Sequence, residues 1–264
     1  MKGRRTRQSG TMGGHAAELR LIPLRSLREI SQGADLAALL MEAAKRERVE
    51  FQRGDVLVLA QKVVSKAEGR TVNLRSVKPS ELAREWAPRV GQDPRLIEVV
   101  LRESRRVIRM TERALIVETR HGFVCANAGV DRSNVPGERV TCLPDEPDAS
   151  ARRIAAGVRR RTGIAVPVIV SDTFGRAWRL GLVNVAIGAY GLGVLEDLRG
   201  TRDALGHPLR ATILAVADEL AAAAGLLMGK NEAVPAVIVR GFRYRPARET
   251  AQRLLRPAAE DMFR

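Results

Sequence analysis

The stretch VPVIVSDTFGRAWRLGLVNVAIGAYGLG, residues 166–193, combines a strand signal with a cluster of reactive side chains. Its first residues are apolar and mostly β-branched, which predicts a buried strand over about residues 165–170. Polar and charged residues follow at once: Ser171, Asp172, Thr173, Arg176 and Arg179. Buried strands usually end in turn residues, so a carboxylate beside a hydroxyl leaves two interpretations, a turn or an active site.

The glycines at the end of this stretch do not form a standard nucleotide motif. Gly188, Gly191 and Gly193 are spaced G-x-x-G-x-G, whereas the dinucleotide fingerprint requires G-x-G-x-x-G. The segment GLLMGK, residues 225–230, misses the phosphate-binding loop spacing by one residue. We therefore expect neither a Rossmann nor a P-loop fold, and interpret the glycines as a close approach of two backbones.

Outward from this stretch, apolar spacing and capping residues predict an alternation of helices and strands. Asp35 is the expected N-cap of a helix over 35–48, and Asp93-Pro94 opens another that carries Leu96, Val99, Val100 and Val107. Further helices are predicted over 148–162 and 211–228, and strands over 56–59, 114–119, 122–128 and 234–242. Because several strands are adjacent, we predict a mixed α/β (α+β) fold with two interwoven lobes over residues 19–264.

Composition bounds the classes of function. The chain has 264 residues and two cysteines, and no apolar run long enough to span a membrane, so a cytoplasmic protein is expected. Residues 1–18 are predicted to be a disordered leader. The net charge is +15, but the arginines are spread along the chain and aromatic residues make up only 3%. That pattern favours anionic small substrates over nucleic acid.

Two aspartates after apolar segments are candidate metal ligands. Asp131 lies in a polar loop with Asn134, and Asp172 is followed by Thr173. Carboxylate, hydroxyl and amide oxygens suit Mg²⁺ or Mn²⁺, although either aspartate alone has the alternative role of capping a turn. Three histidines far apart make a zinc site improbable.

Two lysines follow the strand predicted at 56–59. Lys62 and Lys66 stand four residues apart, in a chain that has only six lysines. A lysine after a strand can act as a point charge on phosphate. The alternative is a pair of solvated lysines on a helix face.

Six segments together resemble one family in their order and spacing. They are GDVLVLAQKVVSKAEGR, HGFVCANAGVDRSNVPG, DEPDAS, SDTFGRAWRLGLVNVAIG, VADELAAAAGLLMGK and VPAVIVRG, and the resemblance as a whole covers about residues 20–243. The family is that of the coenzyme F-420-0:L-glutamate ligases, the γ-glutamyl ligases of deazaflavin coenzyme biosynthesis. The chain resembles the free-standing form of these enzymes rather than the form fused to a nitroreductase-like domain.

The resemblance implies an enzyme that uses GTP, two Mg²⁺ or Mn²⁺ ions and K⁺, works as a homodimer, and joins L-glutamate to F-420-0. It implies that Asp131 and Asp172 hold one metal, that Thr173 holds the second, and that Asp131, Asp172 and Lys66 are the catalytic residues. The expected nucleotide contacts are Leu27, Arg28, Glu29, Ile30, Gln61, Lys62, Lys66, Asn134, Met228, Gly229, Lys230 and Glu232.

One position departs from the family pattern. Lys230 stands where some members place an oxygen donor for the second metal, and a protonated lysine cannot ligate a cation. Either Glu232 replaces it, or Thr173, phosphate and water hold that metal. Two alternatives to the implied function also stay open: a ligase of the same fold for another anionic carboxylate, and a basic nucleic-acid-binding module.

Overall fold

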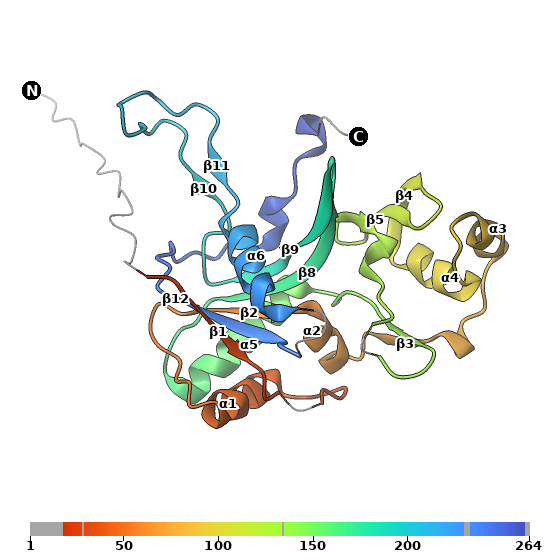
Figure 1. Ribbon diagram of the computed structural model, residues 1–264, viewed down its shortest axis with the longest axis horizontal. Coiled ribbons are helices and arrows are strands. Elements are labelled where there is room, and N and C mark those ends of the chain that lie inside the picture. Colours follow the sequence, from red (N-terminus) through yellow and green to blue (C-terminus); the bar gives the residue numbers. More distant parts are fainter. Residues whose placement is uncertain (1–17, 28, 134, 230–232, 262–264) are drawn as a thin grey trace, which may run out of the picture.

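The computed structural model describes residues 18–27, 29–133, 135–229 and 233–261, and its largest unit is a five-stranded sheet (Figure 1). The strand order is β1-β12-β2-β8-β9, with β2 and β8 parallel and the other neighbours antiparallel. The strands are β1 (Arg20–Leu24), β12 (Ala236–Arg240), β2 (Val56–Ala60), β8 (Val168–Arg176) and β9 (Arg179–Tyr190). The leader predicted at 1–18 falls outside the described residues apart from Glu18.

Helices cover both faces of this sheet, which confirms the predicted mixed α/β fold. On one face lie α1 (Leu36–Arg46), α2 (Gln61–Ala67) and α5 (Pro147–Thr162), and on the other lies α6 (Val216–Met228). Within the described ranges no helix is both long and apolar enough to cross a membrane.

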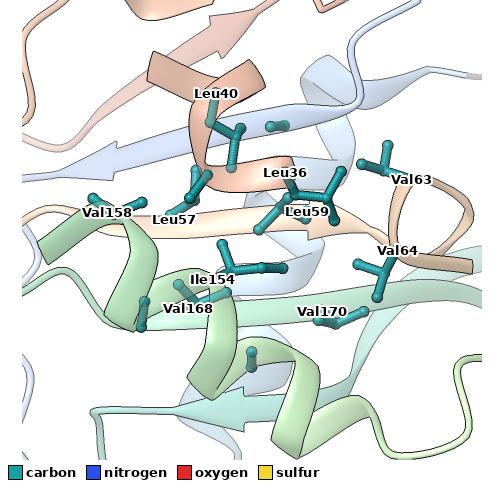
Figure 2. Packing of buried hydrophobic residues seen from close by; sticks show 14 of the residues in the cluster. Leu36, Leu40, Leu57, Leu59, Val63, Val64, Ile154, Val158, Val168 and Val170 are labelled. Atoms are coloured by element: carbon teal, nitrogen blue, oxygen red, sulfur yellow. The ribbon is translucent and has the colours of Figure 1, made fainter. Parts of the chain in front are cut away.

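Side-chain alternation along the strands builds a core on each face. Leu57 and Leu59 of β2 pack with α1 and α5, as Figure 2 shows, while Val56 and Val58 pack with α6. All four side chains are fully buried. Burying such a side chain contributes about 1.5–3 kcal/mol. Because β2 is buried on both faces, its sequence is an uninterrupted apolar run rather than an alternation of apolar and polar residues.

The helix starts predicted from capping residues are confirmed, but one helix ends early. Asp35 accepts the Ala38 amide hydrogen at 3.0 Å and caps α1. Asp93 does the same for Arg95 at 2.8 Å and caps α4 (Pro94–Arg102). Assigning Val107 to that helix is wrong. It lies in a strand, β4 (Ser104–Met110), because pairing with β5 overrides the helical spacing.

A smaller part is formed by residues 71–141, between α2 and α5. Its three-stranded sheet has the order β4-β5-β6, and β3 pairs separately with β7. Its elements are β3 (Thr71–Asn73), α3 (Glu81–Arg89), α4, β4, β5 (Leu115–Thr119), β6 (Val124–Ala126) and β7 (Arg139–Thr141). The strands predicted at 114–119 and 122–128 are confirmed as β5 and β6, with His121 in the turn between them.

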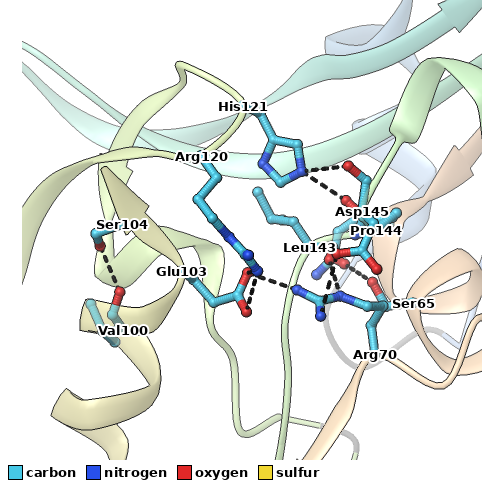
Figure 3. A network of polar contacts seen from close by, with 11 residues as sticks. Ser65, Arg70, Val100, Glu103, Ser104, Arg120, His121, Leu143, Pro144 and Asp145 are labelled. Carbon is cyan, nitrogen blue, oxygen red and sulfur yellow. Dashed lines mark hydrogen bonds and ion pairs between the residues drawn. The ribbon is translucent and has the colours of Figure 1, made fainter. Parts of the chain in front are cut away.

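A polar network fastens the smaller part to the chain on either side of it (Figure 3). Glu103, which is buried, accepts hydrogen bonds from Arg70 at 2.7 Å and from Arg120 at 3.0 Å. Arg70 also donates to the Leu143 carbonyl at 2.9 Å. His121 Nε2 lies 2.9 Å from the Pro144 carbonyl oxygen. These contacts fix the position of the smaller part beside the main sheet.

The remaining elements include a short arm before α6. β10 (Glu196–Asp197) pairs with β11 (Ile213–Leu214), so the helix predicted over 211–228 begins only at Val216. Pairing of Ile213 with Asp197 accounts for the later start. Four short 3₁₀ helices complete the described chain: η1 (Leu74–Ser76), η2 (Asn127–Gly129), η3 (Ala251–Leu254) and η4 (Ala258–Glu260).

Candidate active site

The segment Ser171-Asp172-Thr173 lies inside β8, not beyond its end as the sequence suggested. Asp172 pairs with Val185, and Thr173 with Asn184, across the β8–β9 hairpin. The strand continues to Arg176, because Thr173 and the residues after it find partners on β9 and so extend the ladder. The expected strand end at residue 170 is therefore wrong, and these polar side chains are held by a sheet rather than by a loop.

A β-bulge immediately precedes these residues. Val170 pairs with Gly188 but Ser171 pairs with Ala186, which leaves Ile187 as the extra residue. The Ala186 amide donates to Asp218 Oδ1 at 2.8 Å, so the first turn of α6 satisfies the disturbed backbone. Bulges of this kind change the direction of a strand next to functional sites.

The close backbone approach expected at the glycines is present at this bulge. A Cβ added to Gly188 would lie 2.5 Å from the carbonyl carbon of Pro147, at the start of α5. Only glycine fits at that distance. The glycine therefore lets α5 press against the hairpin that carries the polar residues.

A cavity of about 1010 Å³ lies beside the hairpin. Its wall is contributed by β8, β9, α2, α6 and three connecting segments. The sequence-predicted residues that line it are Leu27, Glu29, Ile30, Gln61, Lys62, Lys66, Asp131, Asp172, Thr173, Met228 and Gly229. Arg28, Asn134, Lys230 and Glu232 lie outside the described residues. Arg176 and Arg179 lie near the tip of the hairpin and are not part of the cavity wall.

Asp131 is held in the cavity by a dense set of contacts. Its Oδ1 accepts the Ser133 amide hydrogen at 2.7 Å, and its Oδ2 lies 2.7 Å from Lys62 Nζ. Partial burial by itself raises the pKa of this carboxyl, but the hydrogen bonds from Lys62 and Ser133 outweigh burial, so the pKa lies below its usual value. Asp131 is therefore ionised at neutral pH and oriented toward the cavity.

Thr173 is positioned by Asn184, which the sequence did not suggest, and Asn184 in turn contacts the predicted residue Met228. The Thr173 hydroxyl donates to Asn184 Oδ1 at 3.0 Å, and Asn184 Nδ2 lies 3.6 Å from Met228 Sδ of α6. Because the hydroxyl proton is directed to Asn184, the lone pairs of the Thr173 oxygen remain available to a cation. Gly225 of α6 allows this arrangement, since its missing side chain leaves room for Asn184.

Three further polar residues of the wall were missed as site residues: Ser133, Ser171 and Asn184. Ser133 and Ser171 stand beside predicted residues, so proximity in the sequence was an available signal. Asn184 had none, because its place depends on the register of the hairpin.

The cysteine nearest to Asp172 is not a nucleophile. Burial, together with the charge of Asp172, raises the pKa of Cys125 to about 12, so its thiol stays protonated at neutral pH. Cys125 and Cys142 are both buried and free. The chemistry of the cavity therefore belongs to its carboxylates, hydroxyls and lysines.

The oxygen atoms of the cavity suit a hard divalent cation. Asp131 and Asp172 supply carboxylates, and Thr173 supplies a hydroxyl, which are ligands that Mg²⁺ and Mn²⁺ accept. Across the described ranges no three residues among Asp, Glu, His and Cys come together as a metal site. A cation here would draw its remaining ligands from hydroxyls, backbone, water or a bound phosphate.

The comparisons with known proteins place the chain among the ligases. A relative from Methanopyrus kandleri named "Coenzyme F420:L-glutamate ligase" is 45% identical over 96% of this chain and 100% of its own length. Relatives with the same name from Methanothermobacter thermautotrophicus and Methanocaldococcus jannaschii are 45% and 41% identical over 92% and 81% of the chain, and over 98% and 86% of their own lengths. The model of the family described as "F420-0:Gamma-glutamyl ligase" matches residues 25–241, and the chain belongs to this family.

Proposed function

We propose that the protein joins L-glutamate to the lactyl carboxylate of coenzyme F-420-0 with GTP as the energy source, and adds further glutamate by γ-linkage. The family membership and the printed names of the relatives support the ligation and the acceptor. The observation that carries the proposal is the cavity of about 1010 Å³, whose wall includes the carboxylates of Asp131 and Asp172, the hydroxyl of Thr173 and the ammonium groups of Lys62 and Lys66. Its size and charges suit a nucleoside triphosphate beside an anionic acceptor.

The reaction needs activation, because a carboxylate has no adequate leaving group for attack by an amine. In the proposed first step, an acceptor carboxylate oxygen attacks the γ-phosphorus of GTP, and the bond to the β-phosphate oxygen breaks. This gives GDP and an acyl phosphate. The glutamate amine then attacks the acyl carbon, inorganic phosphate leaves, and the amine loses a proton to form the amide. The γ-carboxylate of the added glutamate accepts the next phosphoryl group in the same way.

The side chains of the cavity have distinct proposed roles in positioning these anions. Lys66 holds nucleotide phosphate as a point charge. Asp131 and Asp172 hold one Mg²⁺ or Mn²⁺ and Thr173 holds a second, with K⁺ as a further ion. The divalent cations, when bound, neutralise the charge of the phosphates during transfer. Glu29, Ile30 and Gln61 also line the cavity, and we assign them to the contacts with the nucleotide.

A ligase of the same fold for another anionic carboxylate would use the same chemistry, so the identity of the acceptor is argued from the cavity wall. An apolar portion of the wall favours an acceptor with a flat aromatic part, because Leu182, Ala222 and Leu226 line the cavity beyond Asn184. Leu226 is 82% exposed, so its side chain is accessible to a ligand in the cavity. The family membership does not support the other alternative, a nucleic-acid-binding module.

The proposal includes a homodimer. Two large apolar side chains at the hairpin tip face solvent, Trp178 at 85% and Leu180 at 97% exposure. A second copy that packs on this tip would cover them. Light scattering after size exclusion measures the mass: a dimer that Leu180→Glu converts to a monomer supports the proposal, and a wild-type monomer refutes this part of it.

The test of the function is mass spectrometry of the product from F-420-0, L-glutamate, GTP and Mn²⁺. We expect a mass increase of one or more glutamyl units, with release of GDP and phosphate. Asp172→Ala should abolish the product while far-UV circular dichroism stays unchanged, and Lys66→Ala should mainly weaken GTP binding. Full turnover by Asp172→Ala would exclude that residue from the site. A panel of other anionic carboxylates, read by GDP release, decides the acceptor.

A further inference from the structure

The ammonium group of Lys62 occupies an oxygen-lined position in the cavity. Its Nζ lies 2.7 Å from Asp131 Oδ2 and 2.9 Å from the Ser133 carbonyl oxygen, and it also contacts Ser133 Oγ. The Lys62 side chain is 19% exposed and that of Asp131 37%, so water screens the pair only in part. A single positive charge is thus surrounded by three oxygen atoms from one short segment.

These oxygens are of the kind that a divalent cation takes. Asp131 Oδ2 is the carboxylate oxygen that lies beside Lys62 Nζ, and a hydroxyl and a backbone carbonyl are ordinary ligands of Mg²⁺ and Mn²⁺. Two cations cannot share this carboxylate oxygen at hydrogen-bond distance, because their mutual repulsion in a partly buried site is large. Asp131 Oδ1 already accepts the Ser133 amide hydrogen at 2.7 Å, and a metal ion that binds through Oδ2 has to displace the ammonium group.

We propose that Lys62 is a built-in competitor of the divalent cation at Asp131, and that it transfers from Asp131 to the nucleotide phosphates when the cation binds. This inference rests on the proposed function, which places a metal and GTP in the cavity. The flexible four-carbon chain of lysine allows such a transfer. Lys62 and Lys66 line the same cavity from one helix and are four residues apart, so phosphate bound between them would contact both.

The exchange couples the two ligands. A metal ion alone must break the Lys62–Asp131 ion pair without compensation, whereas phosphate offers the released ammonium group a new partner. GTP should therefore strengthen metal binding, and the metal should strengthen GTP binding by the same factor. Without Lys62 this part of the coupling disappears. Before either ligand binds, Lys62 neutralises the charge of Asp131.

The test measures Mn²⁺ binding by electron paramagnetic resonance, with no nucleotide present. Lys62→Met removes the charge and keeps the length of the side chain, and we expect it to bind Mn²⁺ at least fivefold more tightly than the wild type. Lys66→Met is the matched control, because it removes the same charge from the same helix and no contact joins Lys66 to Asp131 among the described residues. Its Mn²⁺ affinity should stay within about twofold of the wild type.

A second measurement reports the exchange itself. The factor by which GTP tightens Mn²⁺ binding should fall at least threefold in Lys62→Met. The gained affinity should vanish in Lys62→Met/Asp131→Asn, which shows that the gain arises at Asp131. Equal, weaker or undetectable Mn²⁺ binding by Lys62→Met overturns the inference, and so does a gain that survives loss of Asp131.

These outcomes separate the inference from the proposed function. If the wild type makes the glutamyl product but Lys62→Met binds Mn²⁺ no more tightly, only the competitor role fails. If the wild type makes no product, the ligase proposal fails whatever the metal titration shows. Thermal unfolding of each variant confirms that the affinities belong to folded protein.

Discussion

Replacement of Gly225 by alanine should have two opposite effects: it stabilises helix α6 and disturbs the positioning of Thr173. Gly225 lies inside α6, where alanine is favoured over glycine by about 0.5–1 kcal/mol. The added Cβ, however, would lie 2.9 Å from Asn184 Cγ and 3.1 Å from Asn184 Nδ2. Cβ atoms essentially never approach other atoms so closely, so the Asn184 side chain has to move and its hydrogen bond with Thr173 is lost.

The two effects on stability nearly cancel. A neutral hydrogen bond contributes about 0.5–1.5 kcal/mol, which is close to the gain from the helix. We therefore expect the free energy of unfolding of Gly225→Ala to stay within about 1 kcal/mol of the wild type. Catalysis has no such compensation, because Thr173 loses its fixed orientation, and kcat/KM for glutamyl addition should fall about threefold to tenfold.

A double-mutant cycle with Asn184→Ala tests the reasoning. With Asn184 truncated, the Cβ at position 225 meets no amide group and only the Cβ at position 184, at 3.2 Å, so Gly225→Ala should stabilise the protein by part of the helix gain and change kcat/KM no further. Urea unfolding and steady-state rates of all four proteins give the cycle. An equal loss of activity from Gly225→Ala in both backgrounds would refute the argument, since the methyl group would then obstruct the cavity directly.

Three further substitutions test other parts of the site. Gly188→Ala places its Cβ 2.5 Å from the Pro147 carbonyl carbon, so the thermal midpoint should drop with a loss of about 1–3 kcal/mol; an unchanged midpoint contradicts this packing. Burial raises the pKa of Asp218, whose ionised form is therefore disfavoured in the folded protein. Asp218→Asn, which still accepts the Ala186 amide hydrogen, should stabilise the protein at pH 7 and lose this advantage below the ordinary pKa of 3.8, where the wild-type carboxyl is protonated whether folded or unfolded. Urea unfolding at pH 7 and pH 3 measures the difference, and an advantage that persists in acid contradicts the sign. Leu226→Glu should raise the KM for the acceptor severalfold and leave the thermal midpoint unchanged, because the Leu226 side chain is 82% exposed on the cavity wall. Steady-state kinetics with each substrate varied in turn measure the KM values. An equal rise in the KM for GTP would contradict the reasoning.

Local signals predicted the parts of the fold that depend on neighbouring residues. Asp35 and Asp93 cap helices because their carboxylates reach amides two or three residues ahead, which the sequence alone contains. The continuous apolar run of β2 likewise needs no partner to be recognised. Val107 and the start of α6 were assigned wrongly for the opposite reason, since long-range pairing with β5 and β10 decides those segments.

The site residues that the sequence could predict are those whose residue type alone suggests a chemical role. Acidic and basic side chains such as Asp131 and Lys62 stand out in a sequence, and both line the cavity. Their ion pair does not stand out, because it joins α2 to a segment 69 residues further on. Asn184 was missed because only the register of β8 against β9 brings it to Thr173.

The adjacency of Asp172 and Thr173 follows from the geometry of the strand that holds them. Successive side chains of a strand point to opposite faces. Thr173 bonds to Asn184 and so faces α6, whereas Asp172 lies near Cys125 of β6 and so faces the smaller part that also supplies Asp131. One dipeptide thus serves two sides of a single cavity. The bulge places its extra residue, Ile187, on β9, so it leaves the alternation along β8 unbroken and sets the register that brings Asn184 opposite Thr173. A turn at this point would offer no such alternation, which is why the proposed two-cation site depends on β8 continuing through these residues.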